Sequence, residues 1–235
     1  MSNIRSVAET GSTNTDMVAL ARTGVEEGVW LRADRQTAGR GRQGRGWSSP
    51  VGNFSGSTLV RLRPTDPAAA SLALVAAVAL HETVAAVHPA DALRLKWPND
   101  LLLGDAKLAG ILLERSDDAV VVGIGVNLAH HPGLPERPTT SLSAWGASVA
   151  VEPFAELLAA TFARWLGRWR GEGLSVVRAG WLDRAHPVGT ALTARLPDGG
   201  SVDGLFEGLD PDGALILRLA SGERRVIHAG DVFLL

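Results

Sequence analysis

The sequence predicts an α+β fold in which a larger unit of strands and helices is followed by a small β-barrel. Apolar residues recur at helical spacing over 152–170, whereas 120–128 is rich in branched residues, as in a buried strand. From about His186 the pattern changes to short apolar runs separated by Gly, Pro and Asp turns. That change is typical of a small barrel at the end of the chain.

The first part of the chain alternates between helix and strand signals. Small polar residues at 12–16 precede a short helix that a glycine ends, and their hydroxyls are expected either to cap that helix or to contact a ligand. Glu82 is the only full charge over 68–87, but Pro67 and Pro89 flank this alanine-rich stretch, so we expect a buried helix and not a membrane span. The predicted elements are a helix at 17–24, strands at 29–34 and 54–60, and the helix at 68–87.

The second part supplies the rest of the predicted sheet. We expect a strand over 93–103 that is broken at Pro98 and resumed, a hairpin partner at 107–114, and a central strand at 120–128 whose glycines, Gly123 and Gly125, allow a close approach. An amphipathic helix is predicted over 152–170. The barrel strands are predicted at 190–196, 202–209, 214–219, 224–228 and 232–235.

Composition excludes several classes of protein. With 235 residues, 46% hydrophobic and 20% charged, the chain is long enough for one sizeable core and a small second domain. A net charge of −2 gives no basic field for duplex nucleic acid. Zero cysteines exclude disulfides and thiolate metal sites, and the N-terminus lacks a signal peptide, so a cytoplasmic location is expected. His130 and His131 lack a further histidine or cysteine at ligand spacing nearby, and we expect a loop there.

A glycine- and arginine-rich run at 39–46 is the least ordinary part of the chain. Four glycines and three arginines interleave within these eight positions, which predicts a loop able to change shape. Guanidinium groups bind phosphate and carboxylate oxygens two bonds at a time, and glycines let backbone N–H groups approach the same anion. We therefore interpret 35–47 as a clamp for phosphate and carboxylate, mobile when empty.

Two other interpretations of this run are weaker. Residues 39–44 fit the pattern G-x-G-x-x-G, but the dinucleotide fingerprint requires a helix directly afterwards, and Trp47 to Asn53 has turn chemistry instead. Arginine and glycine also alternate in RNA-binding tails, but those tails lie in low-complexity surroundings, whereas apolar segments flank this run. From the loop alone, a ligand clamp and a basic surface loop remain equal alternatives.

Five motifs in order resemble those of biotin protein ligases: Ser12-Thr13-Asn14, the loop, Lys96-Trp97-Pro98-Asn99-Asp100, Lys107 to Leu112, and Gly123 to Asn127. The likeness covers almost the whole chain. It implies a catalytic domain related to class II aminoacyl-tRNA synthetases at 1–185 and an SH3-like barrel at 186–235. Some members of that family carry an N-terminal DNA-binding domain. Only eleven residues precede Ser12, so we expect a short form without that domain and no DNA partner.

The resemblance also implies the reaction and its partners. Biotin and MgATP would give biotinyl-5′-AMP and pyrophosphate, and a lysine of a biotin carboxyl carrier domain of acetyl-CoA or a related carboxylase would then attack the mixed anhydride. The resemblance implies ATP and Mg²⁺ as cofactors and no membrane partner, while no Mg²⁺ ligand is identified. The sequence leaves monomer and homodimer open.

Site residues are carried over from the resemblance onto matching positions. Lys107, Arg42 and Asp100 are the expected catalytic residues, with Asp100 either accepting a proton or helping to hold Mg²⁺. The expected biotin-binding residues are Ser12, Thr13, Asn14, Gln36, Gly39, Arg40, Gly41, Arg42, Lys107 and Gly110. The expected ATP-binding residues are Arg42, Arg45, Trp47, Lys96, Asn99, Lys107 and Asn127.

The sequence leaves two rival functions open. A lipoate or octanoate ligase or transferase of the same superfamily would use a substrate without a ureido ring, and the polar groups of Ser12, Thr13 and Gln36 would then lose their hydrogen-bonding partners. A non-enzymatic RNA-binding module would use the arginine loop and the barrel, and its binding would weaken steeply with salt.

Overall fold

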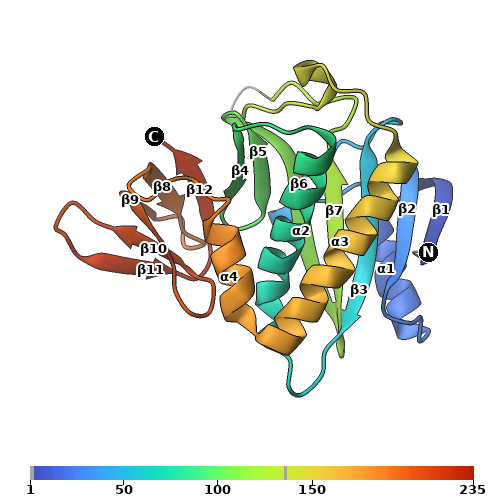
Figure 1. Cartoon of the computed structure of the whole chain (residues 1–235), viewed down its shortest axis with the longest axis horizontal. Helices are drawn as coiled ribbons and strands as arrows, with labels where there is room; N and C mark the ends of the chain where they lie inside the picture. The colour runs from blue at the N-terminus through green and yellow to red at the C-terminus, as the bar shows by residue number, and fades with distance from the viewer. Residues whose placement is uncertain (1–2, 135–136) are drawn as a thin grey trace.

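The computed structural model describes residues 3–134 and 137–235, which form two β-sheets with helices (Figure 1). Seven strands make a sheet in the order β1-β2-β3-β7-β6-β5-β4. Strands β1 and β2 pair in parallel and all other neighbours are antiparallel, so the sheet is mixed. The α+β class is confirmed. The strands are β1 (Asn3–Thr10), β2 (Val29–Gln36), β3 (Phe54–Arg61), β4 (Leu93–Lys96), β5 (Asp100–Leu103), β6 (Ala106–Ser116) and β7 (Ala119–Val126).

Helices cover both faces of this sheet. The helices are α1 (Thr13–Arg22), α2 (Leu72–Val87), α3 (Val151–Glu172) and α4 (Leu174–Leu182). Met17 of α1 packs with Leu59 and Val121 in one buried cluster, while Val60 and Val122, the next residues on the same strands, belong to the cluster beneath α2 and α3. Successive strand residues point to opposite faces, so α1 lies on one side and α2 and α3 on the other (Figure 1).

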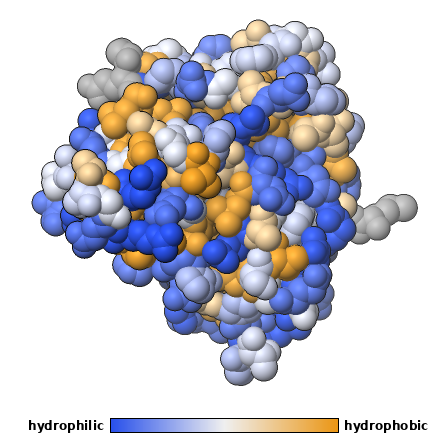
Figure 2. Space-filling model, turned by 60° about the vertical axis from the view of Figure 1, so that its left-hand side comes forward, coloured by the Kyte–Doolittle hydropathy of each residue, from blue (hydrophilic) through white to orange (hydrophobic). Residues whose placement is uncertain are grey.

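The helix expected at 68–87 is buried in the larger core. Residues Ala69–Val87 have the length and hydropathy of a membrane span. Within α2, however, Leu72, Val75 and Leu80 are fully buried, and α3, α4 and the sheet pack around the helix. The prediction of a core helix is confirmed. On the face shown in Figure 2, apolar patches are separated by hydrophilic residues.

Three details differ from the sequence prediction. The segment at 93–103 is not one interrupted strand, because the chain reverses at Trp97–Pro98–Asn99 and β4 pairs antiparallel with β5. Strand β1 was not predicted, and its residues are mostly exposed at the sheet edge, so the sequence shows no apolar alternation there. Helix α4 was also missed, since its nine residues are too few for a clear helical period.

The five predicted terminal strands form a second, antiparallel sheet in the order β11-β10-β9-β8-β12. Its strands are β8 (Ala191–Arg195), β9 (Ser201–Leu209), β10 (Leu215–Arg218), β11 (Arg224–Ile227) and β12 (Asp231–Leu234). Trp97 Nε1 donates to Gly213 O at 3.1 Å, and Lys96 Nζ donates to Val232 O at 2.9 Å, so the β4–β5 turn is tied to this sheet. A domain boundary at 185/186 falls between α4 and β8 and stays a prediction.

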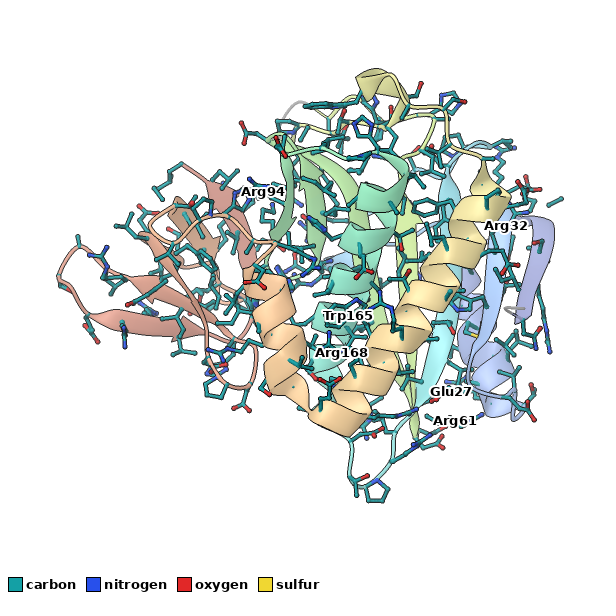
Figure 3. The ribbon with its side chains drawn as sticks, viewed as in Figure 1. Glu27, Arg32, Arg61, Arg94, Trp165 and Arg168 are labelled. Atoms are coloured by element: carbon teal, nitrogen blue, oxygen red, sulfur yellow. The ribbon has the colours of Figure 1, made fainter. Side chains whose placement is uncertain are left out.

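An ion cluster fastens the C-terminal end of α3 to the sheet. Arg170 pairs with Glu27 at 2.5 Å and with Asp66 at 3.3 Å. The backbone N–H of Arg61 donates to Glu27 at 2.8 Å, and Figure 3 labels both of these residues. Burial acts to raise the pKa of Glu27, but the hydrogen bonds from Arg170 and from the backbone of Arg61, together with the charge of Arg170, outweigh it and hold that pKa below its ordinary value. The cluster lies away from the cavity described next and has a structural role.

Candidate active site

A cavity of about 850 Å³ lies between the glycine-rich loop, strands β5 to β7 and the last strand β12. Its lining includes six cationic side chains and three acidic ones. This local excess of positive charge contrasts with the net charge of −2 for the whole chain and favours an anionic ligand. The charged lining residues are Arg40, Arg42, Arg45, Lys96, Lys107, Arg137, Asp100, Asp105 and Asp231.

One end of the cavity carries a buried cluster of hydroxyl and amide groups. The backbone N–H and Oγ1 of Thr13 donate to Gln36 Oε1 at 2.8 and 3.1 Å. Ser57 Oγ lies 2.8 Å from Thr13 Oγ1 and 2.6 Å from Asn14 Oδ1. Ser12 precedes α1 in an extended conformation and its side chain makes no capping hydrogen bond, although the residue is only 5% exposed. Ser12 therefore does not cap α1 through its side chain, and its expected ligand contact stays a prediction.

Three glycines let side chains lie flat on the sheet. A Cβ on Gly123 would lie 2.0 Å from Asn14 Oδ1, and one on Gly125 would lie 2.4 Å from Trp47 Nε1. A Cβ on Gly110 would meet Lys107 Nζ at 3.1 Å. The close approach predicted at 123 and 125 is confirmed, and the groups that approach are protein side chains that line the cavity.

Asp100 lies between two lysines in the middle of the cavity. Lys107 Nζ donates to Asp100 Oδ1 at 2.5 Å, and Lys96 Nζ is 3.5 Å from Asp100 Oδ2. Burial lowers the pKa of Lys96 below its ordinary value, the charge of Asp100 opposes that change, and Lys107 adds to it. Lys107 Nζ also lies 5.6 Å from the centroid of the Trp47 ring, within cation–π range. These residues form a cationic centre that one carboxylate only partly neutralises.

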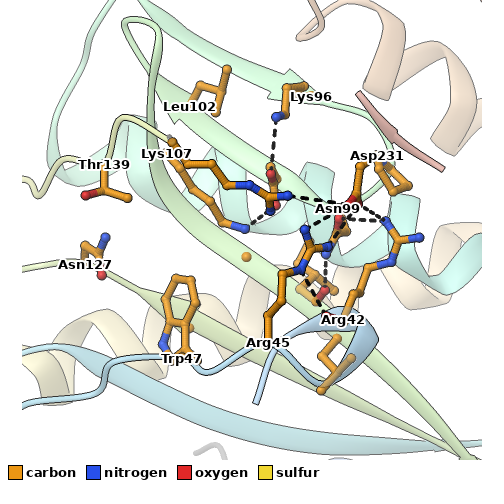
Figure 4. Close-up of a pocket in the computed structure, with 18 of the residues that line it drawn as sticks. Arg42, Arg45, Trp47, Lys96, Asn99, Leu102, Lys107, Asn127, Thr139 and Asp231 are labelled. Atoms are coloured by element: carbon orange, nitrogen blue, oxygen red, sulfur yellow. Dashed lines mark hydrogen bonds and ion pairs between the residues drawn. The ribbon is translucent and has the colours of Figure 1, made fainter. Parts of the chain in front are cut away.

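The loop arginines reach across to the terminal sheet (Figure 4). Arg45 contacts both carboxylate oxygens of Asp231, at 2.8 and 3.0 Å, and Arg42 and Arg137 lie 3.5 and 3.7 Å from the same carboxylate. Burial alone would raise the pKa of Asp231. The hydrogen bond and charge of Arg45, with the charges of Arg42 and Arg137, outweigh burial and hold that pKa below its usual value.

Asn99 and Asn127 fasten the segments around the cavity. Asn99 Nδ2 donates to Ile111 O at 2.6 Å, and its Oδ1 is 3.4 Å from Arg42. Asn127 Nδ2 donates to Thr140 O at 3.0 Å. Both side chains line the cavity but their amide groups are already bound to the protein, which favours a role in holding the walls.

The structure brings the sequence-predicted site residues to this one cavity, with a single exception. Gly39 is not part of the lining, and it packs closely against the loop backbone, since a Cβ there would lie 2.6 Å from Trp47 O. Its expected contact with biotin stays a prediction. Sequence reasoning missed Ser57, Glu114, Arg137 and Asp231. Gly230-Asp231 is a turn signal in the sequence, whereas no local sequence pattern distinguishes Ser57, Glu114 or Arg137.

The histidine pair and the rest of the described chain offer no preformed metal cage. His131 Nδ1 lies 3.1 Å from Ser141 Oγ. Over 3–134 and 137–235 there is no group of three or more His, Cys, Asp or Glu side chains placed to hold an ion.

Comparison with known proteins identifies the family. A model described as the biotin/lipoate A/B protein ligase family matches residues 8–128, and one described as the biotin protein ligase C terminal domain matches residues 190–235. The chain is 44% identical to a biotin–[acetyl-CoA-carboxylase] ligase of Paracoccus denitrificans, over 97% of this chain and 98% of the relative. This chain belongs to the biotin protein ligase family.

Solved structures of the family share the fold of this ligase. A biotin protein ligase from Aquifex aeolicus in complex with biotin and ATP superimposes with a TM-score of 0.89 at 24% identity, covering 100% of both chains, which supports the fold. One from Leishmania major in complex with biotinyl-5-AMP gives a TM-score of 0.70 at 25% identity, covering 97% of this chain and 99% of that one. The predicted fold and the resemblance stated from the sequence are both confirmed.

Proposed function

We propose that this enzyme activates biotin with ATP as biotinyl-5′-AMP and transfers the biotinyl group to a lysine of a biotin carboxyl carrier domain. One observation carries the proposal beyond the family assignment. The same cavity has a buried hydroxyl and amide cluster at one end and a group of arginines and lysines at the other. The first suits a neutral ring with hydrogen-bonding groups, and the second suits a carboxylate beside phosphates.

The polar end is assigned to the ureido ring of biotin. Ser12, Thr13 and Gln36 would hydrogen-bond that ring, and Asn14 and Gly110 would form its walls. Ser12 is 5% exposed and its side chain makes no capping hydrogen bond, so an analogue without these ring groups would deny its hydroxyl the partner that the ring would supply. This cost disfavours lipoate and octanoate, which lack a ureido ring.

The cationic end is assigned to the first reaction. An oxygen of the biotin carboxylate attacks the α-phosphorus of ATP, the bond from that phosphorus to the bridging oxygen breaks, and pyrophosphate leaves. Both reactants are anions, so their approach and the charge on the leaving pyrophosphate require positive groups. Lys107 would lie at the carboxylate and α-phosphate, with Arg42 and Arg45 at the phosphates. Each cation already stands in the cavity, which reduces the reorganisation needed during reaction.

The family chemistry also uses Mg²⁺ with ATP, and the residues present fit such an ion in a limited way. Mg²⁺ in nucleotide sites is commonly bound by one or two carboxylates together with substrate phosphates. Asp100 is the carboxylate at the cationic centre and would supply one ligand oxygen. When bound, the ion would offset negative charge on the phosphate oxygens. The lysines and arginines of the cavity would orient the carboxylate and phosphate groups of the substrates.

In the second reaction the Nζ of the acceptor lysine attacks the acyl carbon, an amide forms, and AMP leaves with the bridging oxygen. The attacking amine must lose a proton, and Asp100 is our candidate to accept it. Until transfer occurs, the mixed anhydride must be shielded from water, and the glycine-rich loop is the segment suited to cover it. Acetyl-CoA carboxylase or a related enzyme would carry the acceptor domain, and we infer a cytoplasmic location.

The decisive experiment follows radiolabelled biotin onto a purified carrier domain, with ATP present or omitted. We expect label on the carrier, and equimolar pyrophosphate, only when ATP is present. Parallel reactions contain lipoate or octanoate in place of biotin. Transfer of either acid at a rate equal to that of biotin would defeat the substrate assignment, and failure to form pyrophosphate with any acid would defeat the reaction.

A further inference from the structure

Glu114, near the end of β6, lies outside the cavity lining but touches two of its walls. Its Oε2 accepts a hydrogen bond from Asn14 Nδ2 at 2.7 Å, and its Oε1 accepts one from Arg40 at 3.2 Å. Asn14 belongs to the first turn of α1, and Arg40 belongs to the glycine-rich loop. One carboxylate therefore joins the polar end of the cavity to the loop that borders it.

The amide of Asn14 is fixed at both of its ends. Its Oδ1 lies 2.6 Å from Ser57 Oγ, and its Nδ2 donates to Glu114, whereas the other acceptor near Nδ2, Leu112 O, is 3.5 Å away. The residue is 5% exposed and lies on Gly123, where even a Cβ would clash. Because a buried amide N–H without an acceptor is costly, Glu114 determines how this amide faces the cavity.

The other oxygen of Glu114 holds the loop. The Arg40 guanidinium bonds to both Glu114 and Thr15 Oγ1, the latter at 2.9 Å. The backbone at Arg40 pairs with that at Gly46, so the position of Arg40 affects the course of the whole glycine-rich run. Moving Glu114 would therefore disturb Asn14 and the loop together.

We propose that Glu114 is a positioning residue that couples occupancy of the polar end of the cavity to closure of the glycine-rich loop. This inference rests on the proposed function, in which that end takes the biotin ring. When the ring orders α1 and Asn14, the shared carboxylate is held where Arg40 can bind it, and the loop stays against the cavity. Without the carboxylate, ring binding and loop position become independent.

The exposure of these side chains indicates where the effect is measurable. The Glu114 and Arg40 side chains are 30% and 46% exposed, so their ion pair contributes little to folding. Asn14, in contrast, is buried at the ligand end. Loss of Glu114 should therefore change the binding of biotin more than the stability of the protein.

The test compares Glu114→Gln and Glu114→Asp with the wild-type enzyme. In Glu114→Gln, whose size is unchanged, we expect KM for biotin to rise about 3- to 10-fold, with kcat and KM for ATP within about 2-fold of wild type. Biotin should also lose most of its ability to slow amide exchange over residues 39–47. Glu114→Asp keeps the charge but has a shorter reach, and it should show a smaller change in the same direction.

A matched control is Glu207→Gln, which removes a carboxylate, 22% exposed, that pairs with Arg224 on the terminal sheet, and it should leave every parameter unchanged. A double-mutant cycle of Glu114→Gln with Arg40→Gln should be strongly non-additive in biotin KM. Additive effects, an unchanged biotin KM, or an equal loss of kcat would overturn the coupling. If the wild type shows biotin-dependent pyrophosphate release and Glu114→Gln behaves normally, the inference fails while the proposed function stands.

Discussion

Arg45 and Asp231 are 186 positions apart in the chain and form a two-point ion pair, with contacts of 2.8 and 3.0 Å. This contact joins the glycine-rich loop to the last strand of the terminal sheet. Arg42 strengthens the connection by donating to Gly230 O at 3.2 Å. The terminal sheet thus forms one wall of the cavity and holds the loop in its present position.

The variant Asp231→Asn should loosen the loop in the ligand-free enzyme. The amide keeps the shape of the carboxylate but removes the charge that Arg42, Arg45 and Arg137 share. For partly exposed pairs a loss of about 1 kcal/mol is reasonable, which corresponds to about 5-fold faster trypsin cleavage within 39–47. Asp118→Asn is a suitable control, because it removes a comparable pair with Arg61 elsewhere on the molecule. Equal cleavage rates in all three proteins would refute the holding role.

The variant Lys107→Ala should slow adenylate formation without unfolding the protein. Removal of one preorganised positive group from a site of developing charge costs about 10²- to 10³-fold in rate. Asp100 would keep Lys96 as a partner, so the fold should tolerate the change. Pyrophosphate release in single-turnover reactions measures the step, and circular dichroism checks the fold. Near-normal release would remove Lys107 from the chemistry.

The sequence predicted those site features that depend on local composition. Arg40, Arg42 and Arg45 are conspicuous within one glycine-rich run, and Lys107 belongs to a short motif. Glu114 and Asp231 were missed because their partners are 74 and 186 positions away, and a lone carboxylate in a strand carries no local signal. Their roles follow from sheet register and from the approach of the terminal sheet, which composition and spacing do not specify.

The same distinction applies to the fold. Strands and helices that bury one face were found from periodicity, as in α3, whose predicted apolar stripe is buried except for Leu157, which is 36% exposed. The β4–β5 reversal was misinterpreted because Pro98 interrupts a run of alternating residues, and an interruption and a tight turn have the same signature. Edge strand β1 lacks a buried face and therefore lacks a pattern.

His81 should make the enzyme less stable as the solution becomes mildly acidic. Burial, with the charges of Arg184 and Arg94, lowers the pKa of His81 from 6.5 to about 4. The unfolded chain therefore binds this proton near pH 6.5, whereas the folded protein binds it only near pH 4, so stability falls as the pH drops through this interval. The loss approaches about 3 kcal/mol.

Urea unfolding of the wild type and of His81→Leu at pH 7.5 and pH 4.5 isolates this contribution. Between pH 7.5 and pH 4.5 the wild type should lose more unfolding free energy than His81→Leu does. A constant difference at both pH values would show that His81 does not titrate in this way.

The variant Gly125→Ala should disturb the part of the cavity around Trp47, one of the residues expected to bind ATP. The added methyl group would lie 2.4 Å from Trp47 Nε1, so the indole must move. We expect KM for ATP to rise about tenfold, which corresponds to about 1.4 kcal/mol. Gly167→Ala is the control, since nothing lies within 4 Å of its Cβ position on α3. If KM for ATP is unchanged in Gly125→Ala, Trp47 has no role in nucleotide binding.

Biotin should slow amide exchange in residues 39–47, because the loop is expected to close over the ligand. This run has internal hydrogen bonds, from Gly41 N to Arg45 O and from Trp47 N to Gly39 O, at 2.7 and 2.9 Å. Closure must therefore add protection to an ordered but half-exposed loop, and we expect exchange to slow by about tenfold at saturating biotin. The turn from Asp210 to Gly213 on the terminal sheet serves as the internal reference. Identical exchange of the loop with and without biotin would rule out closure, and the mixed anhydride would then need another shield from water.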